Sequence, residues 1–122
     1  MPRATKLRDK SHARVYSEWL QLPAWLTLSP YAKALLIQML ASYRPSMQTI
    51  EMTDRAASVA IPCARATAAK ALAELEEKGW IKVERVGARC SLGAKRRGSA
   101  FRLTGQPFYF EPASEDFKRW QA

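Results

Sequence analysis

The chain of 122 residues has the length of a single domain, and with a hydrophobic content of 48% it can bury a core without disulfides or bound metals. Twenty Lys and Arg against eleven Asp and Glu give a formal net charge of +9, which favours a polyanionic partner, either nucleic acid or an anionic membrane. Cys63, Cys90 and His12 are too few for a four-ligand zinc site, and the sequence shows neither a signal peptide nor an apolar run of about 20 residues. We therefore expect a cytoplasmic protein with free thiols, no bound metal and no membrane association.

The first fifteen residues are expected to form a flexible basic arm, because five Lys and Arg face a single acid, Asp9. Such an arm either touches a polyanion or remains a solvated terminus. Residues 16–28, YSEWLQLPAWLTL, are predicted to form a short helix, a turn at Pro23 and a lead-in to the next helix. Their large apolar side chains are expected to cover one side of the core: Trp19, Leu20, Leu22, Trp25, Leu26 and Leu28.

Two helices and a short strand are predicted between residues 29 and 62. Ser29 is a favourable N-cap, Pro30 suits the first helical position, and apolar residues then recur at the helical period until Pro45. Residues 46–52 are compatible with a short strand. Thr53 is predicted to cap a second, short helix that Pro62 ends.

The segment ARATAAKALAELEEK, residues 64–78, is predicted to form a third helix, since nearly every residue is a strong helix former. Gly79 is expected to end it in the left-handed C-cap conformation. The acids at its far end, Glu74, Glu76 and Glu77, can pair with Lys70 and Lys78 at helical spacing. Four apolar residues share one face, which we expect to be buried: Ala68, Ala71, Leu72 and Leu75.

Two strands are predicted to follow, one over residues 80–86 and one over AFRLT, residues 100–104. Between them, GARCSLGAKRRGS at 87–99 contains three glycines and four basic residues without an acid. We expect Phe101 and Leu103 on one face of the second strand and Arg102 on the other.

The tail, residues 105–122, is aromatic and too apolar to be disordered. We expect it to pack either on the domain formed by residues 16–104 or on a second copy. Ser114 is predicted to cap one helical turn that carries Phe117 and Trp120.

The predicted order is helix, strand, helix, turn, helix, strand, basic loop, strand. Within it, TAAKALAELEEKGWI at 67–81 resembles the recognition helix and the following strand of bacterial winged-helix regulators, and AFRLT resembles their closing strand. The lead-in PAWLTLSPYAKALL is similar to that of plasmid- and phage-associated proteins of this kind. The resemblance covers roughly residues 29–104 and implies an α+β winged helix-turn-helix fold, with three core helices and a β-hairpin wing, that binds double-stranded DNA.

The third helix fits the major groove, which is about 12 Å wide. With its apolar face buried, Arg65 and Lys70 should face outward, and Arg65 is the best candidate to read a guanine. Thr67 can reach a phosphate with its hydroxyl. Ala64 offers no N-cap acceptor, which costs the first turn about 1 kcal/mol. The predicted contacts of this helix with DNA are Arg65, Ala66, Thr67, Ala69 and Lys70.

A basic hairpin is the second predicted contact region, because its uncompensated charges would be relieved by a phosphate backbone. The predicted DNA-binding residues here are Arg89, Lys95, Arg96, Arg97 and Arg102.

Catalysis is not expected, because the sequence has no Gly-rich phosphate loop and its only histidine, His12, lies in the arm. No cofactor and no small-molecule ligand is indicated. The leading hypothesis is a DNA-binding transcriptional regulator. A replication or recombination accessory protein of a mobile element is the alternative within DNA binding, and a winged-helix protein-interaction module is the alternative outside it. Paired half-sites would suit a homodimer.

Overall fold

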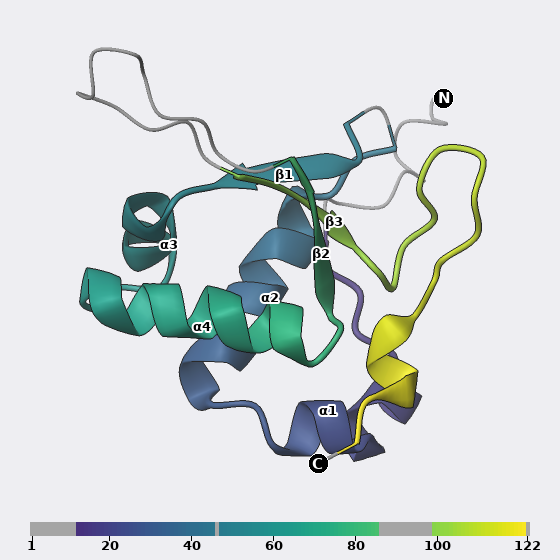
Figure 1. The fold of residues 1–122 in the computed structure, drawn as a ribbon, viewed down its shortest axis with the longest axis horizontal. Coiled ribbons are helices and arrows are strands. Elements are labelled where there is room, and N and C mark those ends of the chain that lie inside the picture. Colours follow the sequence, from purple (N-terminus) through teal and green to yellow (C-terminus); the bar gives the residue numbers. More distant parts are fainter. Residues whose placement is uncertain (1–11, 46, 86–98, 122) are drawn as a thin grey trace, which may run out of the picture.

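A computed structural model describes residues 12–45, 47–85 and 99–121 (Figure 1). These residues form a mixed α+β domain with four α-helices and a small antiparallel sheet. The helices are α1 (Pro23–Leu26), α2 (Pro30–Ser42), α3 (Asp54–Ala60) and α4 (Arg65–Glu77), and the strands are β1 (Thr49–Met52), β2 (Ile81–Arg85) and β3 (Ser99–Leu103). Short 3-10 helices stand at both ends, η2 (Ser17–Gln21) and η3 (Asp116–Arg119).

The helix boundaries follow local signals that the sequence carries. The Ser29 hydroxyl accepts a hydrogen bond from the Ala32 N–H at 3.1 Å, and the Thr53 hydroxyl accepts one from the Ala56 N–H at 2.9 Å. Both predicted caps are therefore confirmed. Gly79 follows α4 with φ of 85°, the left-handed conformation expected of it.

The sheet has the strand order β1-β3-β2, so the last strand in the chain lies in the centre. Ile50 of β1 faces Phe101 of β3, and Ile81 of β2 faces Leu103. The register of β2 shifts between Val83 and Arg85.

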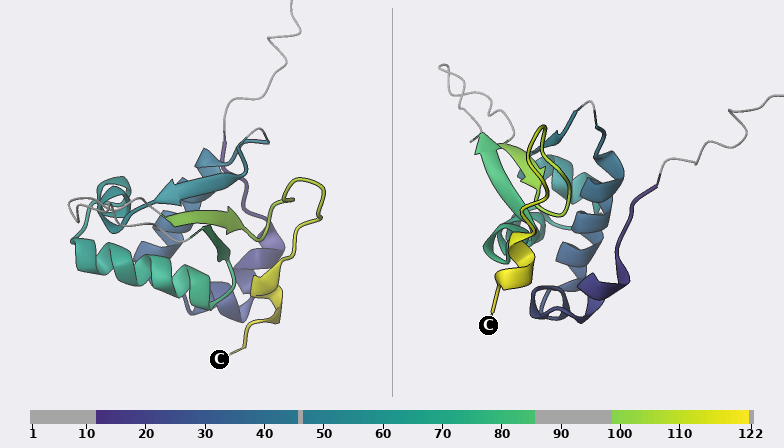
Figure 2. Two further views of the ribbon diagram at one scale, coloured as in Figure 1. Left: turned by 45° about the horizontal axis from the view of Figure 1, so that its top comes forward. Right: turned by 90° about the vertical axis from the view of Figure 1, so that its right-hand side faces the viewer.

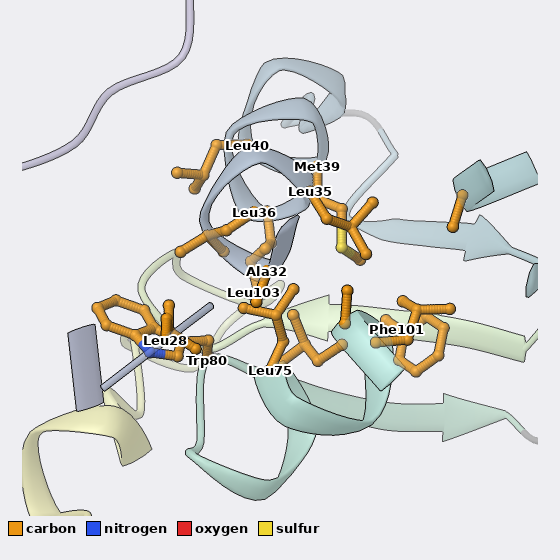
Figure 3. Packing of buried hydrophobic residues seen from close by; sticks show 14 of the residues in the cluster. Leu28, Ala32, Leu35, Leu36, Met39, Leu40, Leu75, Trp80, Phe101 and Leu103 are labelled. Atoms are coloured by element: carbon orange, nitrogen blue, oxygen red, sulfur yellow. The ribbon is translucent and has the colours of Figure 1, made fainter. Parts of the chain in front are cut away.

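The core lies between α2, α4 and the sheet (Figure 3). Leu35, Leu36 and Met39 of α2 point toward Leu75 of α4 and toward β3 in that view. The predicted buried face of α4 is confirmed, since Ala68, Ala71, Leu72 and Leu75 are all buried.

The C-terminal tail packs on its own domain through a second, aromatic part of the core. The ring of Phe117 in η3 stacks on Trp80 at 4.0 Å between centroids, and Trp19 of η2 meets both rings edge-on. The Trp80 indole N–H donates to the Ala24 carbonyl at 3.1 Å. A Cβ on Gly105 would lie 2.9 Å from the Trp19 ring, so this close contact requires glycine. The lead-in and the tail thus meet at the C-terminal end of α4.

Three expectations for these segments are wrong. Leu20 and Leu26 are exposed, because the short helices η2 and α1 bury one side only, through Trp19 and Ala24. Pro23 begins α1 and does not form a turn, since a proline fits the first helical position. Ser114 does not cap η3. Its N-cap is Glu115, at φ of 51°, without a side-chain cap.

Among the described residues, none of the helices has both the length and the apolar character needed to cross a bilayer.

Candidate nucleic-acid interface

Helix α4 has one buried face and one face without cover from the rest of the domain. Arg65, Ala66 and Lys70 are exposed, and Thr67 and Ala69 are half-buried. Arg65, Ala66, Ala69 and Lys70 therefore lie on the exposed side of α4, and Thr67 lies at the edge of that side, next to the buried face. Because Ala66 and Ala69 have short side chains, another molecule can approach the backbone of α4 closely between Arg65 and Lys70.

The N-terminal end of α4, which carries the partial positive charge of the helix dipole, has no side-chain cap. Its N-cap is Ala64, and no side chain caps the first turn, as the sequence predicted. The amides of the first turn and the helix dipole favour an anion at this position. Arg65 stands in the same turn, so its guanidinium adds a full positive charge to the partial charges of the helix end.

Helix α3 crosses α4 near that end and sets its position. Ala57 of α3 and Ala68 of α4 are both fully buried, and their small side chains let the two helices pack closely. Between the helices, the Cys63 N–H donates to the Ser58 carbonyl at 3.3 Å, and Ile61 is buried. In Figure 1, α3 lies over the N-terminal end of α4, where Arg65, Ala66 and Lys70 remain exposed.

Arg55 is an exposed basic residue of α3, the helix that packs on α4, and the sequence pattern did not single it out. It lies exposed in the first turn of α3, next to Asp54. A single arginine beside an acid carries no pattern, so only the packing of α3 on α4 shows where it stands.

The C-terminal end of α4 is anchored to the loop between α1 and α2. Glu74 accepts hydrogen bonds from the Ser29 N–H at 2.7 Å and from the Ser29 hydroxyl at 2.9 Å. The buried ammonium of Lys78 donates to the Thr27 carbonyl at 2.9 Å and to its hydroxyl at 2.7 Å, and lies 4.8 Å from the Trp120 ring centre. Lys78 and Glu74 also form the expected ion pair, at 3.8 Å. The N-terminal half of α4 therefore carries exposed basic residues, whereas Glu74 and Lys78 at its C-terminal end bind to the loop between α1 and α2.

Arg102 does not belong to the surface where the sequence placed it. It is 7% exposed, and its guanidinium lies 3.3 Å from Glu111 and 3.9 Å from Glu84. It also lies 4.6 Å from the ring centre of Phe108. The expectation fails because the chain after β3 folds back over this face of the sheet, so both faces of β3 are covered. An arginine held in this way is not available to a phosphate.

The remaining predicted contacts, Arg89, Lys95, Arg96 and Arg97, lie outside the described residues, as does the arm up to residue 11. Among the residues that the structure does describe, no three His, Cys, Asp or Glu side chains gather as metal ligands would. Cys63 is half-buried and is not in a disulfide.

No protein-family model, curated protein or solved structure matches this chain.

Proposed function

We propose that this domain is a winged helix-turn-helix that binds double-stranded DNA, with α4 in the major groove. The order α2-β1-α3-α4-β2-β3 and the strand order β1-β3-β2 are compatible with that fold. In a helix-turn-helix, the second helix presents its N-terminal residues to the base edges while the first crosses the backbone. Here α4 would be the recognition helix and α3 the supporting one.

The single observation that carries the proposal is the outer face of α4. An exposed arginine and an exposed lysine flank a surface of alanines, on a helix whose opposite face is fully buried. A guanidinium can bond the O6 and N7 atoms of guanine together, and alanine suits the methyl group of thymine. We assign to Thr67, which is half-buried in the first turn of α4, a hydrogen bond from its hydroxyl to a phosphate. These groups match the major groove better than they match an apolar protein surface.

The charge of the chain supports the same partner. A formal charge of +9 attracts DNA at long range and slows release from any duplex. Arg89, Lys95, Arg96 and Arg97 form the strongest basic concentration in the sequence, and we propose that they bind the phosphate backbone as a wing. Sequence-preferring binding of this kind suits a transcriptional regulator.

Selection from a pool of random duplexes tests the proposal, followed by fluorescence anisotropy with the selected duplex and with the unselected pool. We expect a defined motif, a higher affinity for the selected duplex, and an affinity that falls as salt is added. An RNA hairpin of the same length serves as competitor and should displace the DNA poorly. Failure to bind either duplex at low salt would contradict DNA binding, whereas equal binding to both would contradict base reading by α4.

A further inference from the structure

An exposed apolar surface lies at the start of the C-terminal tail, apart from the face of α4. Phe110 is fully exposed, Met47 is 64% exposed and Tyr109 is 60% exposed, with Phe108 half-buried beside them. We name Met47, Phe108, Tyr109 and Phe110 the aromatic tip. The other aromatic residues of the tail, Phe117 and Trp120, pack on the domain itself, so residues 108–110 of the aromatic tip are the aromatic part of the tail that the domain leaves less covered.

Contacts within the domain order the backbone of the aromatic tip. Phe108 and Glu111 exchange two backbone hydrogen bonds, at 3.0 and 2.9 Å, and close a tight turn over Tyr109 and Phe110. Arg102 fixes the base of this turn through Glu111 and the Phe108 ring. A surface that is already rigid loses little entropy when a partner covers it.

The neighbouring loop before β1 is tied to the same turn. The Tyr43 hydroxyl donates to the Pro107 carbonyl at 3.0 Å, and the Tyr109 N–H donates to the Gln48 side chain. Met47 lies between Tyr43 and Gln48 in the chain, so these two hydrogen bonds keep it close to the turn of residues 108–111.

The turn also carries backbone strain. Tyr109 has φ of 54°, a conformation that glycine adopts readily and a bulky residue does not. An exposed aromatic side chain in this position costs stability and contributes nothing to the core. Strain of this kind is typical of sites where the side chain is needed for contact with another molecule.

Each of the two turns that carry the aromatic tip has a charged residue at one end, Arg44 in the turn of Met47 and Glu111 in the turn of Phe108. Arg44 lies exposed at the start of the turn that pairs it with Met47, and its guanidinium donates to the backbone carbonyls of Ala41 and Tyr43. It has no carboxylate partner among the described residues. Glu111 closes the aromatic turn, and its side chain is 69% exposed. Glu111 contacts Arg102 on its inner side and is otherwise exposed, so a surface that carries both Arg44 and Glu111 offers opposite charges to a copy of itself about a two-fold axis.

We propose that the aromatic tip is the contact surface between two copies of this chain, with Arg44 of each copy facing Glu111 of the other. Two chains of charge +9 repel each other unless they meet at a surface where apolar area and opposite charges outweigh this repulsion. The loop between β3 and η3 lies at the opposite end of the molecule from α3 in both views (Figure 1; Figure 2, left). Association here leaves both α4 helices open.

Association through the aromatic tip does not require DNA. A tip of four apolar residues forms a small interface, so the dimer should be weak and dependent on concentration. Two DNA half-sites at the matching distance would strengthen it through effective concentration.

Sedimentation equilibrium without DNA tests the proposal, with loading from micromolar to millimolar chain. The average mass should rise from 13.8 kDa toward twice that value. Met47→Ser and Phe110→Ser should keep the chain monomeric throughout. Leu26→Ser is the matched control, because Leu26 is as exposed as Met47, at 63%, but lies in α1, and it should associate like wild type. A wild-type chain that stays monomeric, or a Leu26 variant that is impaired as much as the tip variants, overturns the proposal.

A charge exchange tests the pairing of the two copies. Arg44→Glu alone should abolish association, since it faces Glu111 with a like charge. Mixing it with Glu111→Arg should restore a mixed dimer, in which each contact again joins opposite charges. Circular dichroism of the Glu111 variant checks that the turn survives without the Arg102 pair. If the mixture of folded variants remains monomeric, the assigned pairing is wrong.

Discussion

Glu74 of α4 caps helix α2 through Ser29, although 45 residues separate them in the chain. Its carboxylate accepts both the backbone N–H and the hydroxyl of Ser29, and the same hydroxyl oxygen accepts the Ala32 N–H of α2. A negative charge at the N-terminus of α2 is also favoured by the helix dipole. One carboxylate therefore fixes the distance between the core helix and the proposed recognition helix.

A double-mutant cycle tests this contact. Glu74→Ala should lower the free energy of unfolding by about 1–3 kcal/mol, since it leaves a part-buried donor pair without an acceptor. Ser29→Ala should cost about 1–2 kcal/mol through the lost cap. The coupling between the two changes should be at least about 0.5 kcal/mol. Glu77→Ala, on the exposed side of the same helix, is the control and should change stability by less than about 0.5 kcal/mol. Strictly additive effects in urea unfolding would contradict the contact.

Two phenylalanines in the tail should behave in opposite ways. Phe117 is fully buried against Trp80 and Trp19, so Phe117→Ala should cost about 3–5 kcal/mol of stability. Phe110→Ala should cost less than about 0.5 kcal/mol, because the ring is fully exposed. Thermal unfolding of both variants at low concentration measures the difference. Similar losses for the two would show that the tail does not pack as described.

Local features of the fold could be predicted from the sequence. Helix caps depend on residues within three or four positions, so Ser29, Thr53 and Gly79 were identified from their neighbours alone. The buried face of α4 follows from the helical period in the same way. The outer position of Arg65 and Lys70 is a direct consequence of that period.

Features that depend on distant parts of the chain could not be predicted. The burial of Arg102 results from the turn that carries Glu111. The alternation of apolar and polar residues in β3 predicts only that Arg102 lies on the face opposite to Phe101 and Leu103. Ser114 looks like an N-cap, but the Glu115 N–H instead donates to the Thr104 carbonyl at 2.8 Å, which sets the start of η3 one residue later. At both positions, contacts with distant residues determine the structure, and the preference of the local sequence does not.

Acid should weaken the attachment of η3. Burial alone would raise the pKa of Asp116, but the neighbouring Ser114 hydroxyl and the charges of Lys82, at 3.5 Å, and Arg119, at 2.9 Å, hold it below its usual value. A carboxyl with a lowered pKa contributes stability that is fully present above its unfolded pKa of about 4 and is lost as the pH falls through the folded value.

Asp116→Asn should therefore flatten the loss of stability between about pH 5 and pH 2. Lys82→Gln should flatten it in part, because one of the two cations remains. Urea unfolding at a series of pH values provides the measurement. An Asn variant with the wild-type pH profile would show that Asp116 contributes nothing to acid sensitivity.

The basic segment between β2 and β3 should contribute to binding on every duplex. Replacing Lys95, Arg96 and Arg97 together by Ala should reduce the slope of log affinity against log salt by up to about three, near 0.9 for each lost phosphate contact. A variant with Lys33, Lys118 and Arg119 replaced by Ala loses the same net charge elsewhere and serves as the control. Equal slopes for wild type and the first variant would remove this segment from the interface.

A substitution of Arg65 tests most directly whether the outer face of α4 reads the bases of DNA. Arg65→Ala should weaken binding to the selected duplex by about 1–3 kcal/mol and binding to random duplex much less, both measured at one salt concentration. Arg119→Ala removes the same charge from η3 and should leave both affinities close to wild type. Arg65→Ala should keep the wild-type stability, since the side chain is exposed, and Arg119→Ala should lose no more than about 1 kcal/mol through its surface ion pair with Asp116. If Arg65→Ala instead weakens both duplexes equally, the residue binds phosphate only, and α4 does not read the bases through it.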